Sequence, residues 1–309
     1  MDAQNSSIRS PDFFIFGCER SGTTLLCALL SEHPEICVVN DSFIYNVLNN
    51  QGWPRNVQLA YKALSRAARS PALLSKAESS HLPSADRPIS ADLPGRFLAA
   101  LIARYRRRTE GNWLAQYAER LEQDPVDNRG IGTYRELLDT VLTKLMPDDQ
   151  REKPLLGEKT PIHSHMQLWL RDSYPKARTV VLLRHPITNV AAMFKRRPSL
   201  GLDRAIDVYL SYYRGALADL LDKPDPGVII VRYEDLLASP QESVGSLQQW
   251  LGAGDSPIAE TFHYFVKQSY VGDRIEPSRD DELRALLDDR QQRQVLDRCA
   301  PIVQQLYAS

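Results

Sequence analysis

A short segment near the start of the chain carries the residue types that bind phosphate. It runs from Gly17 to Thr24 with the sequence GCERSGTT, which sets two glycines five positions apart and follows the second with two threonines. The glycines permit a tight turn, so main-chain N–H groups and the start of a following helix can face an anion. This is the frame of a phosphate-binding loop.

The loop lacks one group that a nucleoside-triphosphate site needs. Such a site has a lysine at the position of Thr23, where it spans the β- and γ-phosphates, whereas here the basic residue is Arg20, inside the loop. We also find no apolar strand ending in an aspartate placed to hold magnesium. The loop therefore suits a single phosphate that carries a further anionic group, handled without a metal.

The elements around this loop predict an α/β fold. Apolar runs at 12–16, 36–39, 155–157, 179–183 and 228–231 read as buried strands, and helical patterns such as 22–30 follow them. Strands that alternate with helices predict a P-loop-like parallel sheet flanked by helices. We interpret 1–309 as a single domain, in which about 53–150 is a helical insertion that packs over the sheet and shapes the binding site of the substrate.

The bulk composition gives no sign of a polyanionic partner. The 309 residues carry a net charge of −1, so nothing in the overall charge indicates nucleic acid or an anionic membrane surface, and we expect neither nucleic acid nor a membrane span. The four cysteines show no metal-binding spacing and fit a reducing compartment. The polar first residues and the short apolar run after them are no signal peptide or membrane span, so we expect a cytoplasmic protein. Nothing in the composition indicates an oligomeric state.

The loop sequence resembles that of a known enzyme family. CERSGTTLL looks like the 5′-phosphosulfate loop of sulfotransferases that use 3′-phosphoadenosine-5′-phosphosulfate (PAPS). The longer GCERSGTTLLCALLSEHPEI is most similar to the tyrosylprotein branch and to the bacterial carbohydrate and natural-product branches. The resemblance implies that Arg20, Ser21, Gly22, Thr23 and Thr24 bind the 5′-phosphate and the sulfonate, with Arg20 also assisting catalysis.

Further segments resemble the same family. TVVLLRHPITNVAAMF implies that Arg184 binds the 3′-phosphate, although Ala192 stands where the family usually has a serine. GEKTP implies that Lys159 contacts the leaving sulfonate, where its ammonium would stabilise the negative charge that builds up in the transition state. VIIVRYEDLL implies that Tyr233 lies near the nucleotide, with a purely structural role as the alternative. YVGDRI resembles the loop over the donor, with Arg274 as a phosphate ligand.

A hydroxyl acceptor must lose its proton, which calls for a nearby carboxylate or imidazole. In the branches that this chain resembles, the base is a glutamate about twenty residues beyond the loop, and the matching position holds Asp41. Asp41 could instead cap the next helix. His163 is the alternative base. His163 and His165 lack an evident third ligand, so we expect no metal site.

The expected function is therefore transfer of a sulfuryl group from PAPS to a hydroxyl, with 3′-phosphoadenosine-5′-phosphate (PAP) as product. Sugar, lipid and natural-product acceptors are favoured over a protein tyrosine. The rival hypotheses are a P-loop kinase or NTPase and a nucleotide-binding module without turnover. Aromatic residues of the insertion (Trp53, Tyr105, Trp113 and Tyr117) are candidates to stack on the acceptor, with a core role as the alternative.

Overall fold

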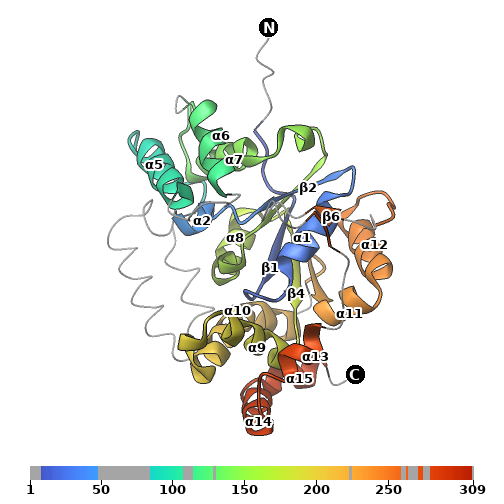
Figure 1. Cartoon of the computed structure of the whole chain (residues 1–309). Helices are drawn as coiled ribbons and strands as arrows, with labels where there is room; N and C mark the ends of the chain where they lie inside the picture. Colours follow the sequence, from blue (N-terminus) through green and yellow to red (C-terminus); the bar gives the residue numbers. More distant parts are fainter. Residues whose placement is uncertain are drawn as a thin grey trace.

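The computed structural model describes residues 8–47, 84–106, 114–127, 130–222, 225–258, 262–263, 271–273 and 279–307. Its centre is a sheet of five parallel strands in the order β2-β3-β1-β4-β5 (Figure 1). The strands are β1 (Phe13–Gly17), β2 (Ile36–Asn40), β3 (Leu155–Lys159), β4 (Arg178–Leu183) and β5 (Val228–Arg232). This confirms the parallel α/β sheet predicted from the alternating pattern. A separate antiparallel pair joins β6 (Phe262–His263) to β7 (Val271–Asp273).

Helices precede or follow every strand of the main sheet. In chain order they are α1 (Thr23–Ser31), α2 (Ile44–Val47), α5 (Leu93–Arg106), α6 (Leu114–Gln123), α7 (Tyr134–Leu145), α8 (Gln167–Ser173), α9 (Pro186–Arg196), α10 (Leu202–Asp222), α11 (Tyr233–Ala238), α12 (Pro240–Leu251), α13 (Arg279–Arg284), α14 (Asp289–Arg298) and α15 (Ala300–Leu306). Short 3₁₀ turns are η3 (Asp148–Gln150), η4 (Pro161–Met166) and η5 (Pro198–Leu200). No helix in these ranges is long and apolar enough to cross a membrane.

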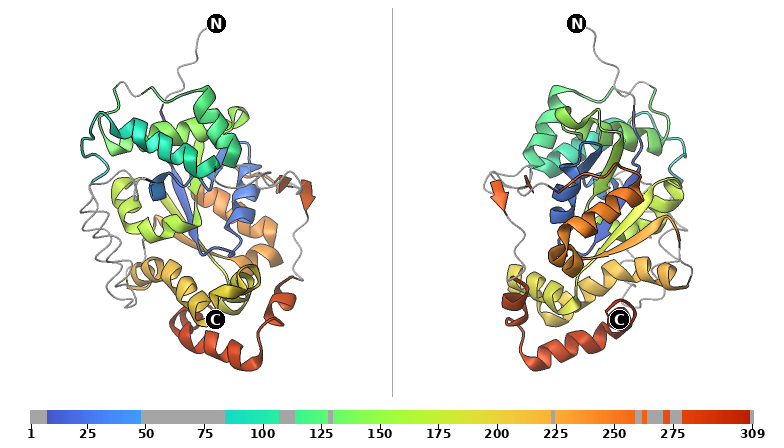
Figure 2. Two further views of the ribbon diagram at one scale, coloured as in Figure 1. Left: turned by 60° about the vertical axis from the view of Figure 1, so that its left-hand side comes forward. Right: turned by 90° about the vertical axis from the view of Figure 1, so that its right-hand side faces the viewer.

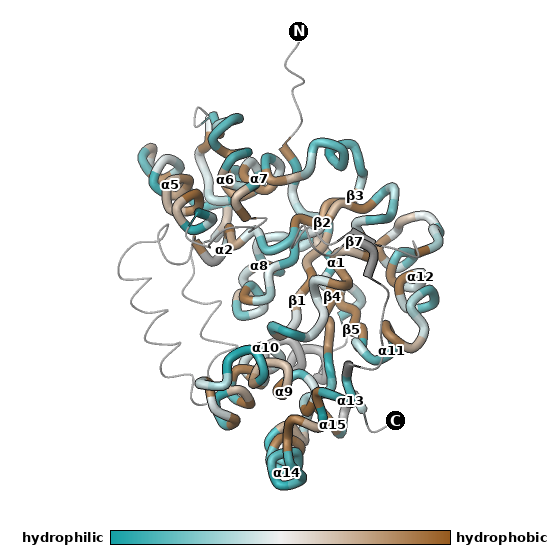
Figure 3. Tube along the Cα trace, viewed as in Figure 1, coloured by the Kyte–Doolittle hydropathy of each residue, from teal (hydrophilic) through white to brown (hydrophobic). Residues whose placement is uncertain are grey.

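Alternate residues of the strands pack on opposite faces of the sheet. Phe13 and Ile15 face α1 and α12 in one apolar cluster. Phe14 and Phe16 face the other way, into a cluster built with α5, α6, α7 and α8. On that second face, Val181 and Leu183 of β4 pack with α9, α10 and α14. Both faces are therefore covered, which explains why the strands read as continuous apolar runs (Figure 3).

The helices of the second face form two groups. Helices α5, α6 and α7, from the stretch interpreted as an insertion, lie at one end, and α9, α10 and α14 lie at the other (Figures 1 and 2). Helix α7 begins with a capping box in which Thr133 and Glu136 satisfy each other's main-chain N–H groups. Residues 51–83 and Trp113 lie outside the described part of the chain.

The third strand is longer than the sequence pattern predicted. The apolar run ends at Gly157, but β3 continues through Glu158 and Lys159, both of which are fully buried. Burial of two charges is unfavourable unless each has partners, and each has partners here, as described below. The extension matters because it carries both side chains to the carboxyl edge of the sheet.

The strand order places a switch point beside the first strand. The connection after β1 leads through α1 to β2 on one side, whereas the connection after β4 leads through α9 and α10 to β5 on the other. Neighbouring parallel strands whose connections diverge leave a crevice at their carboxyl ends, where ligands of open α/β sheets bind. In this chain that crevice lies between Gly17 and Arg184.

Candidate functional site

The loop after β1 depends on its two glycines for close approaches. A Cβ on Gly17 would lie 2.8 Å from the carbonyl oxygen of Leu182 on β4. A Cβ on Gly22 would lie 2.4 Å from the ring of Tyr233, and Gly22 has φ 96°. Only glycine fits both the left-handed conformation and the contact. The predicted loop residue Gly22 and the predicted nucleotide residue Tyr233 are therefore in direct contact.

The loop runs into the start of α1. Gly22 is the residue before Thr23, the first of the helix, and no side chain caps this end. Ser21 is fully buried, and its hydroxyl makes no hydrogen bond of normal geometry with any described residue. Arg20 is exposed and has φ 69°. A buried hydroxyl and an uncapped helix start beside an exposed arginine are the groups that an anion would use here.

Two side chains from the β4–α9 connection brace the loop. Arg184 donates from Nη1 to the carbonyl oxygen of Arg20 at 2.8 Å. Asn189, in the first turn of α9, donates from Nδ2 to the carbonyl oxygen of Glu19 at 2.9 Å. Because both carbonyl groups are held toward α9, the shape of the phosphate-type loop depends on this connection as well as on the glycines.

Arg184 is a largely buried cation of this crevice. Only 6% of the residue is exposed, and its guanidinium lies 4.3 Å from the centre of the Tyr233 ring. Its Nη2 pairs with the carboxylate of Asp280, and its Nε is buried without a hydrogen-bond partner among the described residues. The structure thus brings Gly22, Tyr233 and Arg184 together. The sequence assigned all three to the binding of the donor nucleotide.

The predicted base and the predicted leaving-group lysine are also neighbours. Lys159 is fully buried and donates from Nζ to Asp41 Oδ1 at 2.8 Å and to Thr24 Oγ1 at 3.2 Å. Thr24 belongs to the first turn of α1, so this group is continuous with the loop. The Asp41 side chain is 20% exposed, which leaves the carboxylate open to a ligand on one side.

Asp41 sits in a strained turn after β2. Asp41 has φ 54° and Phe43 has φ 55°, values that residues other than glycine rarely adopt. The hydroxyl of Ser42, rather than the Asp41 carboxylate, accepts the N–H of Ile44 at the start of α2. Together with Arg20, these are the only described non-glycine residues with positive φ. Such strain gathers at functional sites.

A buried carboxylate holds this turn from beneath. Glu158 Oε1 accepts the hydroxyls of Ser42 and Thr160, each at 2.6 Å, and Oε2 lies 3.0 Å from Nδ1 of His163. Burial acts to raise the pKa of Glu158, but His163 and the two hydroxyl hydrogen bonds outweigh it and hold the pKa below its usual value. The carboxylate therefore stays ionised and accepts from all three partners.

The two histidines that the sequence singled out pack with partners other than Asp41 and Lys159. His163 is fully buried beside Glu158, and the ring of Tyr45 packs against it. Glu158 and Lys159 are successive strand residues, so they point to opposite faces of the sheet. His165 packs on Tyr212, and burial lowers its pKa to about 4. Within the described ranges no group of three or more metal-binding side chains is found.

Two predicted features remain to be placed. Ala192 lies in α9 and is buried, so it offers no hydroxyl at the position where the resembling family has one. Arg274 lies outside the residues that the structure describes.

Comparison with known proteins decides the family. A model described as "Sulfotransferase family" matches residues 11–257, which contain the loop, Asp41, Lys159, Arg184 and Tyr233. The chain belongs to the sulfotransferase family. A search of curated proteins gave no match.

Solved structures support the same fold for this sulfotransferase. The sulfotransferase domain from the curacin biosynthetic pathway is 15% identical, with a TM-score of 0.51 over 95% of this chain and 99% of that one. The sulfotransferase domain from the Synechococcus PCC 7002 olefin synthase is 18% identical, with a TM-score of 0.50 over 97% and 98%. At such identities the likeness concerns the fold.

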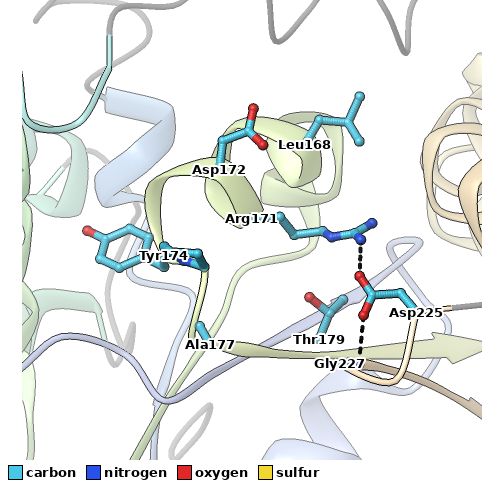
Figure 4. Close-up of a pocket in the computed structure, with 9 residues that line it drawn as sticks. Leu168, Arg171, Asp172, Tyr174, Ala177, Thr179, Asp225 and Gly227 are labelled. Carbon is cyan, nitrogen blue, oxygen red and sulfur yellow. Dashed lines mark hydrogen bonds and ion pairs between the residues drawn. The ribbon is translucent and has the colours of Figure 1, made fainter.

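One hollow of this sulfotransferase lies far from the crevice. It encloses about 300 Å³ and is lined by residues such as Arg171, Asp172, Thr179 and Asp225 (Figure 4). Thr179 and Gly227 stand at the amino ends of β4 and β5, the edge opposite the loop. Arg171 pairs with Asp225 there, and Asp225 Oδ1 accepts the N–H of Gly227 at 2.7 Å. These bonds close a turn, and none of the predicted site residues lines the hollow.

Sequence reasoning missed several residues that shape the site. Glu158, Ser42, Asn189 and Asp280 carry no periodic or motif signal of their own role, because each makes a contact with a residue far away in the sequence. For Glu158 one signal was present, because it belongs to the GEKTP segment and directly precedes Lys159. Tyr105 and Tyr117, considered for stacking, donate to the main-chain carbonyl groups of Ser42 and Asn40 and so support the Asp41 turn.

Proposed function

We propose that this sulfotransferase moves a sulfuryl group from PAPS to a hydroxyl of a sugar, lipid or natural-product acceptor. Transfer is in line, and no metal is invoked because Arg20, Lys159 and Arg184 supply positive charge. The observation that carries the proposal is the meeting of Lys159 and Asp41 at Thr24, beside a loop suited to one phosphate.

The donor half of the proposal uses the crevice at the switch point. Main-chain N–H groups of Arg20 and Gly22–Thr24, with the Ser21 hydroxyl, hold the 5′-phosphate and the sulfonate. Arg184 takes the 3′-phosphate through the planar fork that suits phosphate oxygens. Tyr233 lies against both the loop and Arg184, which supports a place for it beside the nucleotide. Arg274 is assigned as a phosphate ligand of the donor by resemblance alone.

The chemical step requires two things: a base must take the proton of the acceptor hydroxyl, and a cation must stabilise the negative charge on the leaving oxygen. The acceptor oxygen forms a bond to sulfur while the bond from sulfur to the bridging 5′-phosphate oxygen breaks. The acceptor proton passes to the Asp41 carboxylate, and the electron pair of the broken bond leaves with PAP. The Lys159 ammonium stabilises the charge that grows on the leaving oxygen more in the transition state than in the donor.

The positions of the two candidate bases favour Asp41. Its carboxylate is partly exposed and touches Lys159, whereas His163 is enclosed and bonded to Glu158 on the other face of β3. A general base must come within hydrogen-bonding reach of the acceptor hydroxyl. Helices α5 and α6 reach the Asp41 turn through Tyr105 and Tyr117, which supports an acceptor site on that side. We propose a cytoplasmic location for the reaction.

The test is calorimetric titration with PAP and with adenosine 5′-phosphate, which is PAP without its 3′-phosphate, in the absence of magnesium. We expect PAP to bind at least about tenfold more tightly, a difference of about 1.4 kcal/mol. Arg184→Ala should abolish that preference. Arg178→Ala, at the amino end of the same strand, is the matched control and should leave it intact.

Equal affinity of the unmodified protein for the two nucleotides would contradict the donor assignment. Once PAP binding is established, a screen of hydroxyl acceptors with sulfur-labelled PAPS identifies the acceptor class. PAP binding without transfer to any acceptor would instead support the nucleotide-binding module.

A further inference from the structure

The guanidinium of Arg184 already has an anionic partner in this structure. Nη1 is committed to the carbonyl oxygen of Arg20, and Nη2 pairs with the carboxylate of Asp280. One face of the guanidinium lies over the Tyr233 ring. The Arg184 side chain is 7% exposed and that of Asp280 is 18% exposed, so water screens the pair only partly. Only Nε then remains without a partner among the described residues.

Asp280 reaches Arg184 from a distant part of the sequence. It lies in the first turn of α13, which packs against α9, the helix that begins two residues after Arg184. Its neighbours Asp281 and Glu282 are exposed, whereas Asp280 is partly buried against the guanidinium. The carboxylate thus occupies a defined position on the crevice, beside the loop that holds Arg20.

A carboxylate and a phosphate bind an arginine side chain through the same kind of interaction. Both are anions that accept charge-assisted hydrogen bonds from the guanidinium fork. Nη1 and Nη2 each already donate to one partner, and the Asp280 carboxylate stands at Nη2, so a phosphate held by the guanidinium fork would lie next to that carboxylate. A phosphate bound there would meet a like charge at close range unless Asp280 moved away.

We propose that Asp280 competes with the 3′-phosphate of the donor for Arg184 and thereby sets how strongly the enzyme prefers 3′-phosphorylated nucleotides. This inference rests on the proposed function, since it takes Arg184 as the 3′-phosphate residue. Because PAP carries the same 3′-phosphate, the competition weakens product binding and donor binding alike. Asp280 is therefore a specificity-determining residue that acts through Arg184.

The experiment compares Asp280→Asn with Asp281→Asn by calorimetry, using PAP and adenosine 5′-phosphate as ligands. The asparagine keeps an oxygen that accepts from Arg184 and removes only the competing charge. We expect Asp280→Asn to bind PAP about tenfold more tightly, while its affinity for adenosine 5′-phosphate stays within about twofold. Asp281→Asn, one residue away on the exposed side, should change neither affinity.

A second variant tests whether a change at position 280 affects PAP binding only by disturbing α13. Asp280→Glu retains the charge and should bind PAP as the unmodified protein does, and thermal unfolding confirms that all variants are folded. PAP affinity that is unchanged or lower in Asp280→Asn overturns this inference and leaves the donor assignment standing. A fall in affinity for adenosine 5′-phosphate would also overturn it, because Asp280 would then contact a ribose hydroxyl. Failure of both the unmodified protein and Asp280→Asn to bind PAP overturns the donor assignment itself.

Discussion

At the scale of single residues, Asp41 and Lys159 form the most consequential pair of the molecule. Lys159 is enclosed completely, yet its ammonium has an anion and a hydroxyl as partners. Removing one partner of such a pair leaves the other charge uncompensated, so substitutions must be chosen with care. The conformation of Asp41 narrows the choice further, because its φ of 54° is tolerated by asparagine better than by alanine.

We therefore expect Asp41→Asn to remain folded, at a cost in stability because the Lys159 ammonium loses its anionic partner, and to lose activity. Its amide can still accept from Lys159 but cannot take a proton from the acceptor, so kcat should fall by about 10²- to 10⁴-fold. Affinity for PAP should change by less than about threefold, because the nucleotide is held elsewhere. Steady-state kinetics and calorimetry check the two parts separately. Retained turnover in Asp41→Asn, with loss of turnover in His163→Gln, would reassign the base to His163.

At the scale of elements, the turn between β2 and α2 is held by neighbours rather than by its own sequence. Its main-chain carbonyl groups accept from Tyr105 of α5 and Tyr117 of α6, and its Ser42 hydroxyl donates to Glu158 of β3. These contacts maintain the unfavourable φ values of Asp41 and Phe43. The position of the proposed base is therefore a property of three elements packed together.

We expect Ser42→Ala to impair catalysis more than donor binding. The change removes the 2.6 Å bond to Glu158 and the acceptor for the Ile44 N–H, which should lower stability by about 1–3 kcal/mol. As the turn loosens, kcat should fall by about tenfold or more, with PAP affinity nearly unchanged. Ser10→Ala is the matched control, since Ser10 also donates to a buried carboxylate, that of Asp139, far from the site. Equal kinetic effects in both variants would show that only general stability is involved.

The main elements could be predicted from the sequence because their signal is local. The runs DFFIF, ICVV, TVVLL and VIIV are apolar throughout, and buried parallel strands require such runs. The pattern failed at Glu158 and Lys159, whose charges hide the end of β3. Their burial depends partly on Thr160 and His163, which follow closely in the sequence. It also depends on Ser42, Asp41 and Thr24, which come from other segments.

The candidate site could be predicted in part, through residues that repeat a family pattern. The loop, Lys159, Arg184 and Tyr233 were assigned in that way, and the structure brings Gly22 to Tyr233 and Lys159 to Asp41. The contact of Arg184 with Asp280 could not be predicted, because the two residues lie 96 positions apart. No periodicity indicates which carboxylate of an exposed acidic turn will face inward.

At the scale of the whole molecule, buried titratable groups make stability depend on pH in opposing ways. The pKa of His165 is lowered to about 4, mainly by burial, and that of His185 is lowered to about 4 by burial and by the charge of Arg284. The pKa of Asp139 is raised to about 6 by burial, against the hydrogen bonds from Ser10 and Tyr174. As the pH falls, both histidines become protonated at a higher pH in the unfolded chain than in the folded chain. Asp139 instead becomes protonated at a higher pH in the folded chain.

The sign of each contribution follows from linkage. The histidines contribute stability that is present above pH 6.5 and is lost as the pH falls toward about 4. Asp139 does the reverse, since protonation favours the folded state as the pH falls from about 6 toward 3.8. Between pH 7 and 4.5 the free energy of unfolding of the unmodified protein should fall, and His165→Phe should make that fall smaller by about 1–3 kcal/mol. Asp139→Asn should make the fall larger. Thermal unfolding across this range, with pH 8 as reference, tests both, and parallel curves for all three proteins would contradict the assignment.

The three non-glycine residues with positive φ bear on how this enzyme responds to selection for stability. Glycine relieves the strain of a left-handed position by about 1 kcal/mol, so a search for stabilising substitutions would favour it at the exposed Arg20. It would not favour glycine at Phe43, which packs in the core, or at Asp41, which neutralises the buried Lys159. Two of these positions carry a side chain to which the proposed mechanism assigns a charge. Redesign for thermal stability alone would thus remove the Arg20 side chain early while leaving the sheet and the Asp41–Lys159 pair intact. A thermostable derivative of this chain needs Arg20 held constant from the outset.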